Sequence, residues 1–504
     1  MARSWEQQRR DNVRPEAWQQ PIPKARYHLV VIGTGTGGLV SAAIAVGLGA
    51  RVAIVERHEM GGDCLNVGCV PSKALIRAAR AWHDARTAAA RFGGPAANGH
   101  GDFAAVMARM QRIRAALSRV DSAGRFRELG VDVFFGDAQF VDDQSVAVTN
   151  AAGANVALRF HRAIVATGGR AAVPPIDGIA DAGYLTNETI FSLEQLPARL
   201  IVVGGGAIGC ELAQTFARLG SAVTLLDAGA RILPRDDADA ARVVHASFVA
   251  DGITVNNSVQ IIAARRLGDA VTLTCDIGGA RSEITGDALL LATGRTPNIG
   301  ELGLDAAHIA HDVHGIWVND RLRTTNARVF AIGDCASRHQ FTHSADAQAR
   351  LAVPNALFFG LGGGKASSLV MPWCTYTSPE VAHTGMTAEE AEAAGPNVKT
   401  VTISLHDVDR AVLDDEDAGF LRIHLKAGSD RILGATLVAE HAGETISELT
   451  AAIVNGIGLD ALGKTIHPYP TQAEAIRKAA DAHRRERLTP FAKRLFAAFF
   501  RAFG

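Results

Sequence analysis

The sequence lacks the features that mark several large classes of protein. Its 504 residues contain only six cysteines, far fewer than a secreted scaffold held by disulfides would need. Lys and Arg (51) balance Asp and Glu (52), so the formal net charge is −1 and no nucleic-acid partner is expected. No apolar run reaches the roughly 18 residues of a membrane span, and residues 1–26 lack the apolar core of a signal peptide. We therefore expect a cytoplasmic protein of several domains.

Glycine, by contrast, is abundant, and its first cluster follows an apolar strand expected over residues 29–32. Gly33, Gly35 and Gly38 form a G-x-G-x-x-G motif, which is followed by an Ala-rich helix and a second strand that ends at Glu56. Glycines in this context let the backbone approach a pyrophosphate at a helix N-terminus, and the acid accepts hydrogen bonds from a ribose. The segment predicts a dinucleotide-binding unit.

The same pattern recurs later in the chain. Gly204, Gly206 and Gly209 follow a second apolar strand, and Asp227 lies 23 residues after the first glycine, the same spacing as in the first unit. Two such units predict two nucleotides, although an internal duplication with one inactive site is the alternative. We favour NADH over NADPH, because a carboxylate accepts from a ribose 2′-hydroxyl and repels a 2′-phosphate. Arg231 would offset that repulsion only in part.

A pair of cysteines lies between the first unit and a long helix, in the segment GGDCLNVGCVPSKAL. In a regular helix Cys64 and Cys69 would be offset by about 7.5 Å along the axis, whereas a disulfide needs Cα atoms about 4.4–6.8 Å apart. The chain near Gly68 must therefore distort if the two are to pair. Zinc binding is the rival interpretation, but no second Cys pair or His pair accompanies them. A third interpretation is that the two cysteines are buried and purely structural.

This cysteine segment resembles the redox motif of the flavoprotein disulfide reductases, the family of dihydrolipoamide dehydrogenase, glutathione reductase and mercuric reductase. The resemblance covers roughly residues 27–480. It implies an α/β fold with two Rossmann-like dinucleotide-binding domains, for FAD and NAD(P), and a C-terminal α+β dimerisation domain that completes each active site of a homodimer. The expected parts are a polar N-terminal extension (1–26), an FAD-binding domain (27–170 and 290–360), an NAD(P)-binding domain (171–289), a dimerisation domain (365–485) and a basic amphipathic C-terminal helix (486–504).

The resemblance also implies roles for individual residues. Cys69 is the thiolate against the flavin, Cys64 is the outer thiol that meets substrate, and Lys73 lies near the flavin and pairs with Glu211. The residues expected to contact the two cofactors are Gly33, Gly35, Gly38, Glu56, Gly62, Lys73, Ala138, Thr167, Gly168, Asp334, Phe341, Thr342, His343, Ala345, Gly204, Gly206, Gly209, Asp227, Val259 and Gly294.

Near the C-terminus the chain departs from the disulfide-reducing members of the family. Those members carry a proton-shuttling histidine in a His-Pro-Thr-x-x-Glu segment, whereas here Tyr469 takes its place and Glu474 matches the acid. A phenol with a pKa near 10 is a poor base at neutral pH, where an imidazole near 6.5 is well suited. Mercuric reductases carry a tyrosine here and a second one at a place that Tyr184 fits, although the vicinal cysteines at their C-terminus are missing.

These residues favour a mercuric-reductase-like enzyme that passes electrons from NAD(P)H through FAD to the cysteine pair and on to Hg(II) or a related thiol-bound substrate. Dihydrolipoamide dehydrogenase, an NADH:quinone or other acceptor reductase, and a non-catalytic redox sensor are the alternatives. We expect no resident metal ion. The C-terminal segment after Thr489 predicts a helix with Phe491 and other apolar residues on one half and Lys493, Arg494 and Arg501 on the other. This helix would lie on a membrane surface or pack on the dimer partner.

Overall fold

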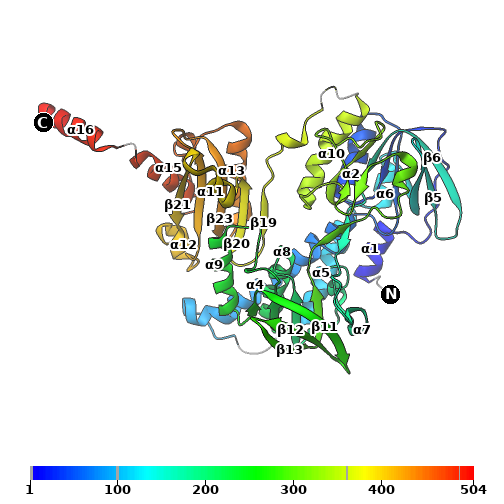
Figure 1. Cartoon of the computed structure of the whole chain (residues 1–504), viewed down its shortest axis with the longest axis horizontal. Helices are drawn as coiled ribbons and strands as arrows, with labels where there is room; N and C mark the ends of the chain where they lie inside the picture. Colours follow the sequence, from blue (N-terminus) through cyan, green and yellow to red (C-terminus); the bar gives the residue numbers. More distant parts are fainter. Residues whose placement is uncertain (1–3, 98–100, 359–360, 362, 487) are drawn as a thin grey trace.

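The computed structural model describes residues 4–97, 101–358, 361, 363–486 and 488–504. Three bodies are visible in Figure 1: an N-terminal unit at the right, a second unit at the bottom and a C-terminal unit at the left. The C-terminal helix α16 (Pro490–Phe503) extends away from the left-hand body. Among the described helices, none is long and apolar enough to cross a membrane.

The first unit is built on a parallel sheet in the order β3-β2-β1-β6, with β18 on the other side of β6. Its strands are buried nearly throughout, because helices α2 and α10 pack on one face of the sheet and side chains of β4 and β5 pack on the other. The N-terminal half of β6 continues into an antiparallel meander with β5 and β4. The elements are β1 (Tyr27–Ile32), α2 (Thr36–Gly47), β2 (Val52–Glu56), α6 (Ala123–Glu128), β3 (Asp132–Phe135), β4 (Asp137–Asp142), β5 (Ser145–Thr149), β6 (Asn155–Val165), β18 (Val329–Ala331) and α10 (Thr342–Leu357).

The second unit repeats this design with a parallel sheet in the order β10-β9-β8-β14 and a separate antiparallel sheet, β11-β12-β13. The boundary expected at residue 290 falls inside β14, which pairs with β8, so the chain leaves this unit only after β14. The elements are α7 (Ile179–Ala182), β8 (Arg199–Val203), α8 (Ala207–Leu219), β9 (Ala222–Leu226), α9 (Ala238–Ala250), β10 (Thr254–Asn256), β11 (Val259–Leu267), β12 (Ala270–Ile277), β13 (Ala280–Gly286) and β14 (Ala288–Leu291).

The C-terminal unit is a five-stranded antiparallel sheet in the order β19-β20-β23-β22-β21. Helix α13 packs on β20 and β23, and α15 packs on β21 and β22. The elements are β19 (Trp373–Thr375), β20 (Glu380–Gly385), α11 (Ala388–Ala394), β21 (Val398–Ser404), α12 (Asp409–Leu413), β22 (Phe420–Lys426), β23 (Ile432–Ala439), α13 (Ala442–Asn455), α14 (Leu459–Leu462) and α15 (Glu474–Glu486).

Two helices link these bodies around the cysteine pair. The short α3 (Gly62–Asn66) ends just before the long α4 (Cys69–Phe92), and α4 packs on α8 of the second unit and on α5 (Phe103–Leu117). Within the N-terminal extension, residues Trp5–Val13 form helix α1, an element that the sequence analysis did not predict. Helix α1 packs against α5 and α6, and its Val13 is buried in the core of the first unit, so α1 is part of the first body.

Candidate active site

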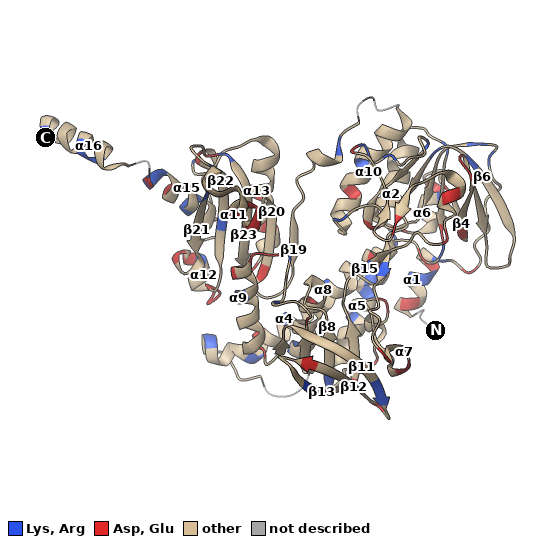
Figure 2. Ribbon diagram, in the orientation of Figure 1, with Lys and Arg blue, Asp and Glu red and all other residues tan. Residues whose placement is uncertain are grey.

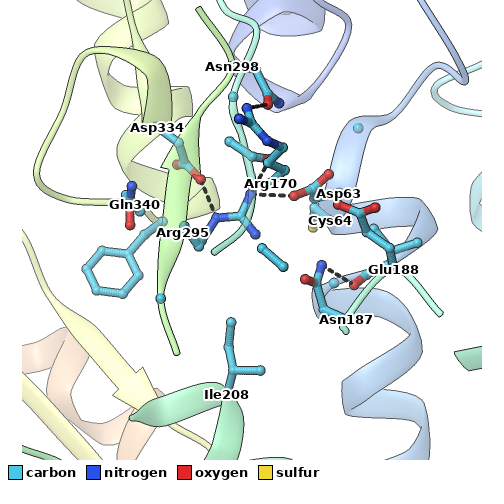
Figure 3. A pocket seen from close by; sticks show the side chains of 18 of the residues that line it. Asp63, Cys64, Arg170, Asn187, Glu188, Ile208, Arg295, Asn298, Asp334 and Gln340 are labelled. Atoms are coloured by element: carbon cyan, nitrogen blue, oxygen red, sulfur yellow. Dashed lines mark hydrogen bonds and ion pairs between the residues drawn. The ribbon is translucent and has the colours of Figure 1, made fainter. Parts of the chain in front are cut away.

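One cavity of about 2400 Å³ connects the glycine turns of the two dinucleotide units and passes the cysteine pair. Figure 3 shows part of its wall, where Cys64 and Arg295 face the same space as Ile208 of α8. Of the residues expected to contact a cofactor, those that line this cavity are Gly33, Gly35, Glu56, Gly62, Lys73, Ala138, Thr167, Gly168, Asp334, Phe341, Thr342, His343, Ala345, Gly204, Gly206, Asp227, Val259 and Gly294.

The two remaining glycines, Gly38 and Gly209, serve the packing of each helix on its strand. A Cβ atom on Gly38 would lie 1.9 Å from the carbonyl oxygen of Gly33, and one on Gly209 would lie 1.8 Å from that of Gly204. Only glycine lets α2 and α8 approach their strands this closely. These positions therefore shape the turns without lining the cavity.

Both turns have the features that a dinucleotide needs. Gly35 is the N-cap residue of α2 and Gly206 that of α8, so neither helix has a side chain that caps its first amides. Those amides and the positive end of the helix dipole are free to bind a pyrophosphate. Near the first turn a Cβ on Gly62 would lie 2.6 Å from the Cα of Gly35, so the backbone here leaves no room for a side chain. The residues present therefore fit FAD in the first unit and a nicotinamide dinucleotide in the second.

The acidic residue of each unit lies at its turn. The Glu56 carboxylate accepts hydrogen bonds from the Thr34 amide (3.0 Å) and the His58 amide (2.7 Å). Asp227 accepts from the amides of Gly205 and Gly229. Each carboxylate is thus fixed at the end of its strand and at the cavity wall, where a ribose would meet it.

The cysteine pair lies where the helix breaks. Val67 and Gly68 interrupt the helical path between α3 and α4, and a Cβ on Gly68 would lie 2.8 Å from the carbonyl oxygen of Asp63. This is the distortion that the spacing requires. Cys69 is the first residue of α4, and its Sγ lies 3.4 Å from Thr342 Oγ1 in the first turn of α10. Two helix N-termini therefore converge on one sulfur.

The surroundings give the two thiols different acidities. A hydrogen bond from Cys64, helped by Thr342 and by the charge of Lys73, overcomes the effect of burial and lowers the pKa of Cys69 to about 6. The same hydrogen bond, together with burial, raises the pKa of Cys64 well above its usual range. Cys69 is thus the thiolate at neutral pH, and Cys64 carries the proton.

An ion pair between α4 and α8 lies next to the thiolate. Lys73 Nζ lies 2.6 Å from Glu211 Oε2 and 4.6 Å from the ring centre of Tyr376, whose amide donates to Glu211 Oε1 at 2.9 Å. Burial alone would lower the pKa of Lys73, but the charge of Glu211 raises it, so the ammonium group stays protonated. The pair expected from the sequence is therefore formed, and it holds a positive charge beside Cys69.

Arg295 is a charged residue of the site that the sequence analysis missed. Its guanidinium lies between Asp334, at 2.9 Å, and Asp63, and it also donates to the carbonyl oxygen of Gly169 at 2.7 Å (Figure 3). Burial raises the pKa of Asp334, and Arg295 opposes this shift. The signal in the sequence was a lone arginine directly after Ala292-Thr293-Gly294, where the chain leaves the buried strand β14.

The predicted C-terminal and tyrosine residues lie outside the described wall of this cavity. Tyr469 is exposed and donates to Asp409 Oδ2 at 2.8 Å, and Glu474 pairs with Arg477 at 2.7 Å. Tyr184 packs against the hydrophobic core of the second unit. A single chain therefore does not bring these three residues to Cys64, and their catalytic roles stay predictions.

One group of described residues outside the cavity brings metal-ligand atoms together. Glu380, His441 and Glu444 place such atoms within 4.8 Å of one another. Glu380 already accepts from the amide of Gly443 at 3.0 Å and lies 3.9 Å from Arg80. Its carboxylate is thus engaged by protein groups.

Comparison with known proteins identifies the family. Residues 27–349 match the model of the pyridine nucleotide-disulphide oxidoreductases, and residues 371–480 match the dimerisation domain of the same proteins. The chain belongs to the pyridine nucleotide-disulphide oxidoreductase family. This confirms the predicted fold class and shows that the protein is an oxidoreductase of a family that depends on FAD and uses pyridine nucleotides. The match to the dimerisation domain supports a homodimer.

Members of this family with several activities are similar to the chain. It is 36% identical to the mercuric reductase of Streptomyces lividans, over 90% of this chain and 95% of that protein. It is 31% identical to the dihydrolipoyl dehydrogenase of Bacillus subtilis, over 90% and 97%. Among solved structures, the HOCl-induced flavoprotein disulfide reductase RclA from Escherichia coli has a TM-score of 0.79 at 27% identity, over 90% and 99%.

Proposed function

We propose that this oxidoreductase takes two electrons from NADH and delivers them to Hg(II), or to a related soft metal ion, bound by Cys64 and Cys69. The observation that carries the proposal is the pair of thiols with unequal pKa values in the wall of a cavity that joins two dinucleotide turns. When bound in the first unit, FAD supplies the chemistry that accepts a hydride and passes two electrons to a disulfide. The chain binds, orients and holds the groups around that chemistry.

The thiol pair suits a soft metal ion. Thiolates are the protein ligands that such ions prefer, and Cys69 is already deprotonated at neutral pH. Cys64 releases its proton when it binds the metal, because the metal displaces protons from its ligands. The ammonium group of Lys73 lies close enough to favour the thiolate form of Cys69 before the metal binds.

The C-terminal unit favours a metal ion over a disulfide as the acceptor. His467, the imidazole beside the predicted proton-transfer position, is 7% exposed and pairs with Glu448 at 3.0 Å. The hydrogen bond from Tyr469 to Asp409 raises the pKa of Tyr469, so its phenol stays protonated at neutral pH. Reduction of a disulfide needs a base that acts near pH 7. The protonated phenol of Tyr469 is not such a base, and the imidazole of His467 is already paired with Glu448.

The second unit favours NADH over NADPH. Arg231 lies four residues after Asp227. Its guanidinium donates hydrogen bonds to the backbone carbonyl oxygens of Leu233, Pro234 and Asp236. The donors of Arg231 are therefore not directed at a 2′-phosphate, which the Asp227 carboxylate would repel.

Anaerobic reduction by NADH followed by rapid mixing with an acceptor tests the proposal. Two-electron reduction is expected to give long-wavelength thiolate–flavin absorbance, and Hg(II) should then reoxidise the protein over repeated turnovers while lipoamide does not. Cys64→Ala should abolish Hg(II) turnover, and Cys275→Ala, in β12, should not.

Three other outcomes separate the alternatives. Rapid turnover of lipoamide with inhibition by Hg(II) would establish dihydrolipoamide dehydrogenase, the activity for which the Bacillus subtilis relative is named. Quinone turnover that survives Cys64→Ala would show that the flavin alone serves the acceptor. No turnover with any acceptor would leave a redox sensor.

A further inference from the structure

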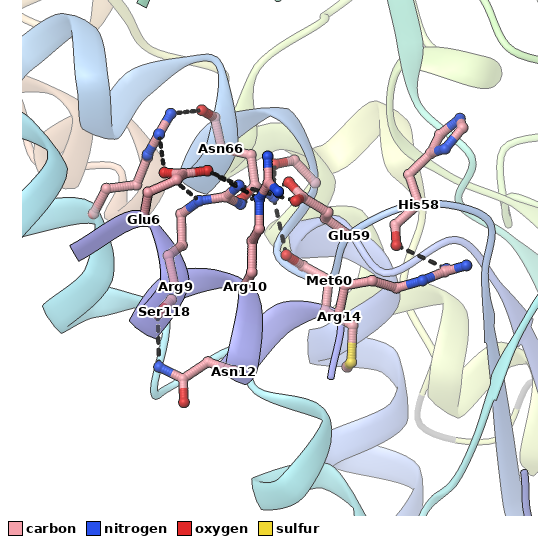
Figure 4. Close-up of polar contacts among 12 residues, drawn as sticks. Glu6, Arg9, Arg10, Asn12, Arg14, His58, Glu59, Met60, Asn66 and Ser118 are labelled. Carbon is pink, nitrogen blue, oxygen red and sulfur yellow. Dashed lines mark hydrogen bonds and ion pairs between the residues drawn. The ribbon is translucent and has the colours of Figure 1, made fainter. Parts of the chain in front are cut away.

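Helix α1 of the N-terminal extension contacts the loop that carries the redox cysteines. The Arg9 side chain is only 5% exposed, and its guanidinium donates to Asn66 Oδ1 at 2.5 Å and to Glu59 at 2.6 Å (Figure 4). The amide of Met60 also donates to the carbonyl oxygen of Val13, the last residue of α1, at 3.0 Å. The extension is therefore bonded to both ends of segment 60–66.

Asn66 is the centre of this contact, and it lies between Cys64 and Cys69 in the chain. Its Nδ2 atom donates to the backbone carbonyl oxygens of Met60 and Gly62, both at 3.0 Å. These two bonds tie the end of α3 back to the residues before it and so close the loop. The backbone carbonyl oxygen of Asn66 accepts a hydrogen bond from Arg114 at 2.8 Å. The orientation of the Asn66 amide group, and so the closure of the loop, depends on the charged donor that Arg9 supplies to Oδ1.

The charges around Asn66 are balanced within the protein. Glu6 of α1 pairs with Arg9 and with Arg114, each at 2.7 Å. Burial would raise the pKa of Glu6, but these two arginines lower it to about 2, so the carboxylate is charged at any physiological pH. The network spans α1, α3 and α5, and it stays intact across the pH range in which Cys69 titrates.

We propose that Arg9 is a positioning residue for the redox cysteines and that α1 is a strap that holds the Cys64–Cys69 loop closed. Arg9 touches neither cysteine and acts through Asn66. The proposal rests on the proposed function, because it assigns Arg9 a role in thiol chemistry. Without the strap, Cys64 would lose its fixed position relative to Cys69, and the hydrogen bond that lowers the pKa of Cys69 would weaken.

Arg9→Gln in the full chain tests the strap, with Arg10→Gln as a matched control. Arg10 is on the same helix but is 61% exposed, and it lies 3.5 Å from Glu6. In Arg9→Gln we expect the amide hydrogens of segment 60–69 to exchange about tenfold faster, which corresponds to the loss of one charge-assisted hydrogen bond. The alkylation rate of Cys69 should also fall at pH 7, because its pKa rises. Arg10→Gln and Arg9→Lys, which keeps the charge, should resemble the wild type more closely.

The outcomes distinguish the strap from simple stabilisation. If Arg9→Gln lowers only the melting temperature, with unchanged exchange in segment 60–69 and an unchanged alkylation profile, the proposal is wrong. If Arg9→Gln does not fold, the same readouts in Glu59→Gln, which removes one charged partner of Arg9, decide the question. A wild-type protein without NADH-dependent thiolate absorbance would contradict the proposed function instead, and the alkylation test would still report on the strap.

The C-terminal helix α16 carries a second, independent inference. Its six large apolar side chains are each at least half exposed, and no Asp or Glu occurs between Leu488 and Gly504 (Figure 2). At about 100° per residue they share one half of the helix, and the three basic residues share the other. The apolar side chains are Phe491, Leu495, Phe496, Phe499, Phe500 and Phe503, and the bases are Lys493, Arg494 and Arg501.

We infer that α16 binds the surface of an anionic phospholipid membrane. In this arrangement the apolar half of α16 inserts below the lipid headgroups, and its Lys and Arg side chains contact the lipid phosphates. The complete absence of acids favours lipid over a protein surface of this chain, whose net charge is near neutral. Helix α16 also points away from the body of the chain (Figure 1), so its apolar face is accessible.

Sedimentation of the full chain with vesicles tests this inference. We expect binding to phosphatidylglycerol-containing vesicles, weak binding to pure phosphatidylcholine, and a loss of at least about tenfold in Phe496→Ser/Phe499→Ser. Phe92→Ser, which removes an exposed phenylalanine at the end of α4, should bind like the wild type. Absence of binding to anionic vesicles would overturn the inference. If Phe496→Ser/Phe499→Ser instead binds vesicles like the wild type but no longer forms a dimer, α16 packs on the partner subunit.

Discussion

Cys64 and Cys69 show how two identical side chains acquire different chemistry from their surroundings. The largest cause of the low pKa of Cys69 is the hydrogen bond from Cys64. Cys64→Ser retains a donor, so the pKa of Cys69 should stay near its present value of about 6, with the thiolate present above that pH. Cys64→Ala removes the donor and should raise the pKa by more than about one unit. The pH dependence of Cys69 alkylation measures both values, and equal midpoints in the two variants would contradict this account.

Among single residues, the sequence pointed to those that belong to local motifs and missed those that do not. Cys64 and Lys73 lie in the segment GGDCLNVGCVPSKAL. Glu211 was identified because it matches the acid that pairs with this lysine in the family. Arg295 belongs to no such motif: it links Asp334 and Asp63, which are 271 positions apart in the chain. Contacts of this kind are set by tertiary structure, and no local pattern of residues records them.

The glycine turns are the elements whose sequence and structure agree most closely. The backbone contacts at Gly38 and Gly209 leave no room for a Cβ, so Gly38→Ala should reduce FAD content, and Gly209→Ala should weaken NADH binding with FAD retained. Gly47→Ala, on the same helix as Gly38, meets nothing within 4 Å and should be neutral or stabilising by about 0.5–1 kcal/mol. Flavin absorbance per subunit and NADH titration measure the effects. Normal FAD content in Gly38→Ala would show that the turn can widen.

Helices were predictable where a motif or an apolar stripe marks them, and not elsewhere. Helix α8 is buried on nearly every side, so its prediction depends on the glycine motif, which places its start after Gly206. Helix α1 has no apolar stripe, because only Arg9 and Val13 are buried and charged contacts hold it in place. A segment rich in Glu, Gln and Arg therefore indicates only a polar extension.

At the scale of the whole molecule, ion pairs fix the C-terminal unit against the rest of the chain. Arg422 of β22 pairs with Asp237 and Asp239 at the start of α9, and Arg80 of α4 lies 2.8 Å from Glu440. These contacts hold the exposed Tyr469 on a body that does not bring it to Cys64 of the same chain. We therefore expect Tyr469 to serve the cavity of another copy, which is the arrangement that the family resemblance implies.

A mixed dimer tests whether the active site is completed by the partner subunit. Cys64→Ala and Tyr469→Phe, each on its own, should lower Hg(II) turnover by at least about tenfold. In a heterodimer of the two, one site has both substitutions and the other has neither, if Tyr469 serves the cavity of the partner. Refolding an equal mixture should then recover about a quarter of wild-type activity, because half of the dimers are mixed and each has one intact site. If Tyr469 serves its own chain, every site in the mixed dimer carries one substitution and no activity returns. A mixture that stays inactive, although mass spectrometry shows the heterodimer, would therefore place the complete site within one subunit.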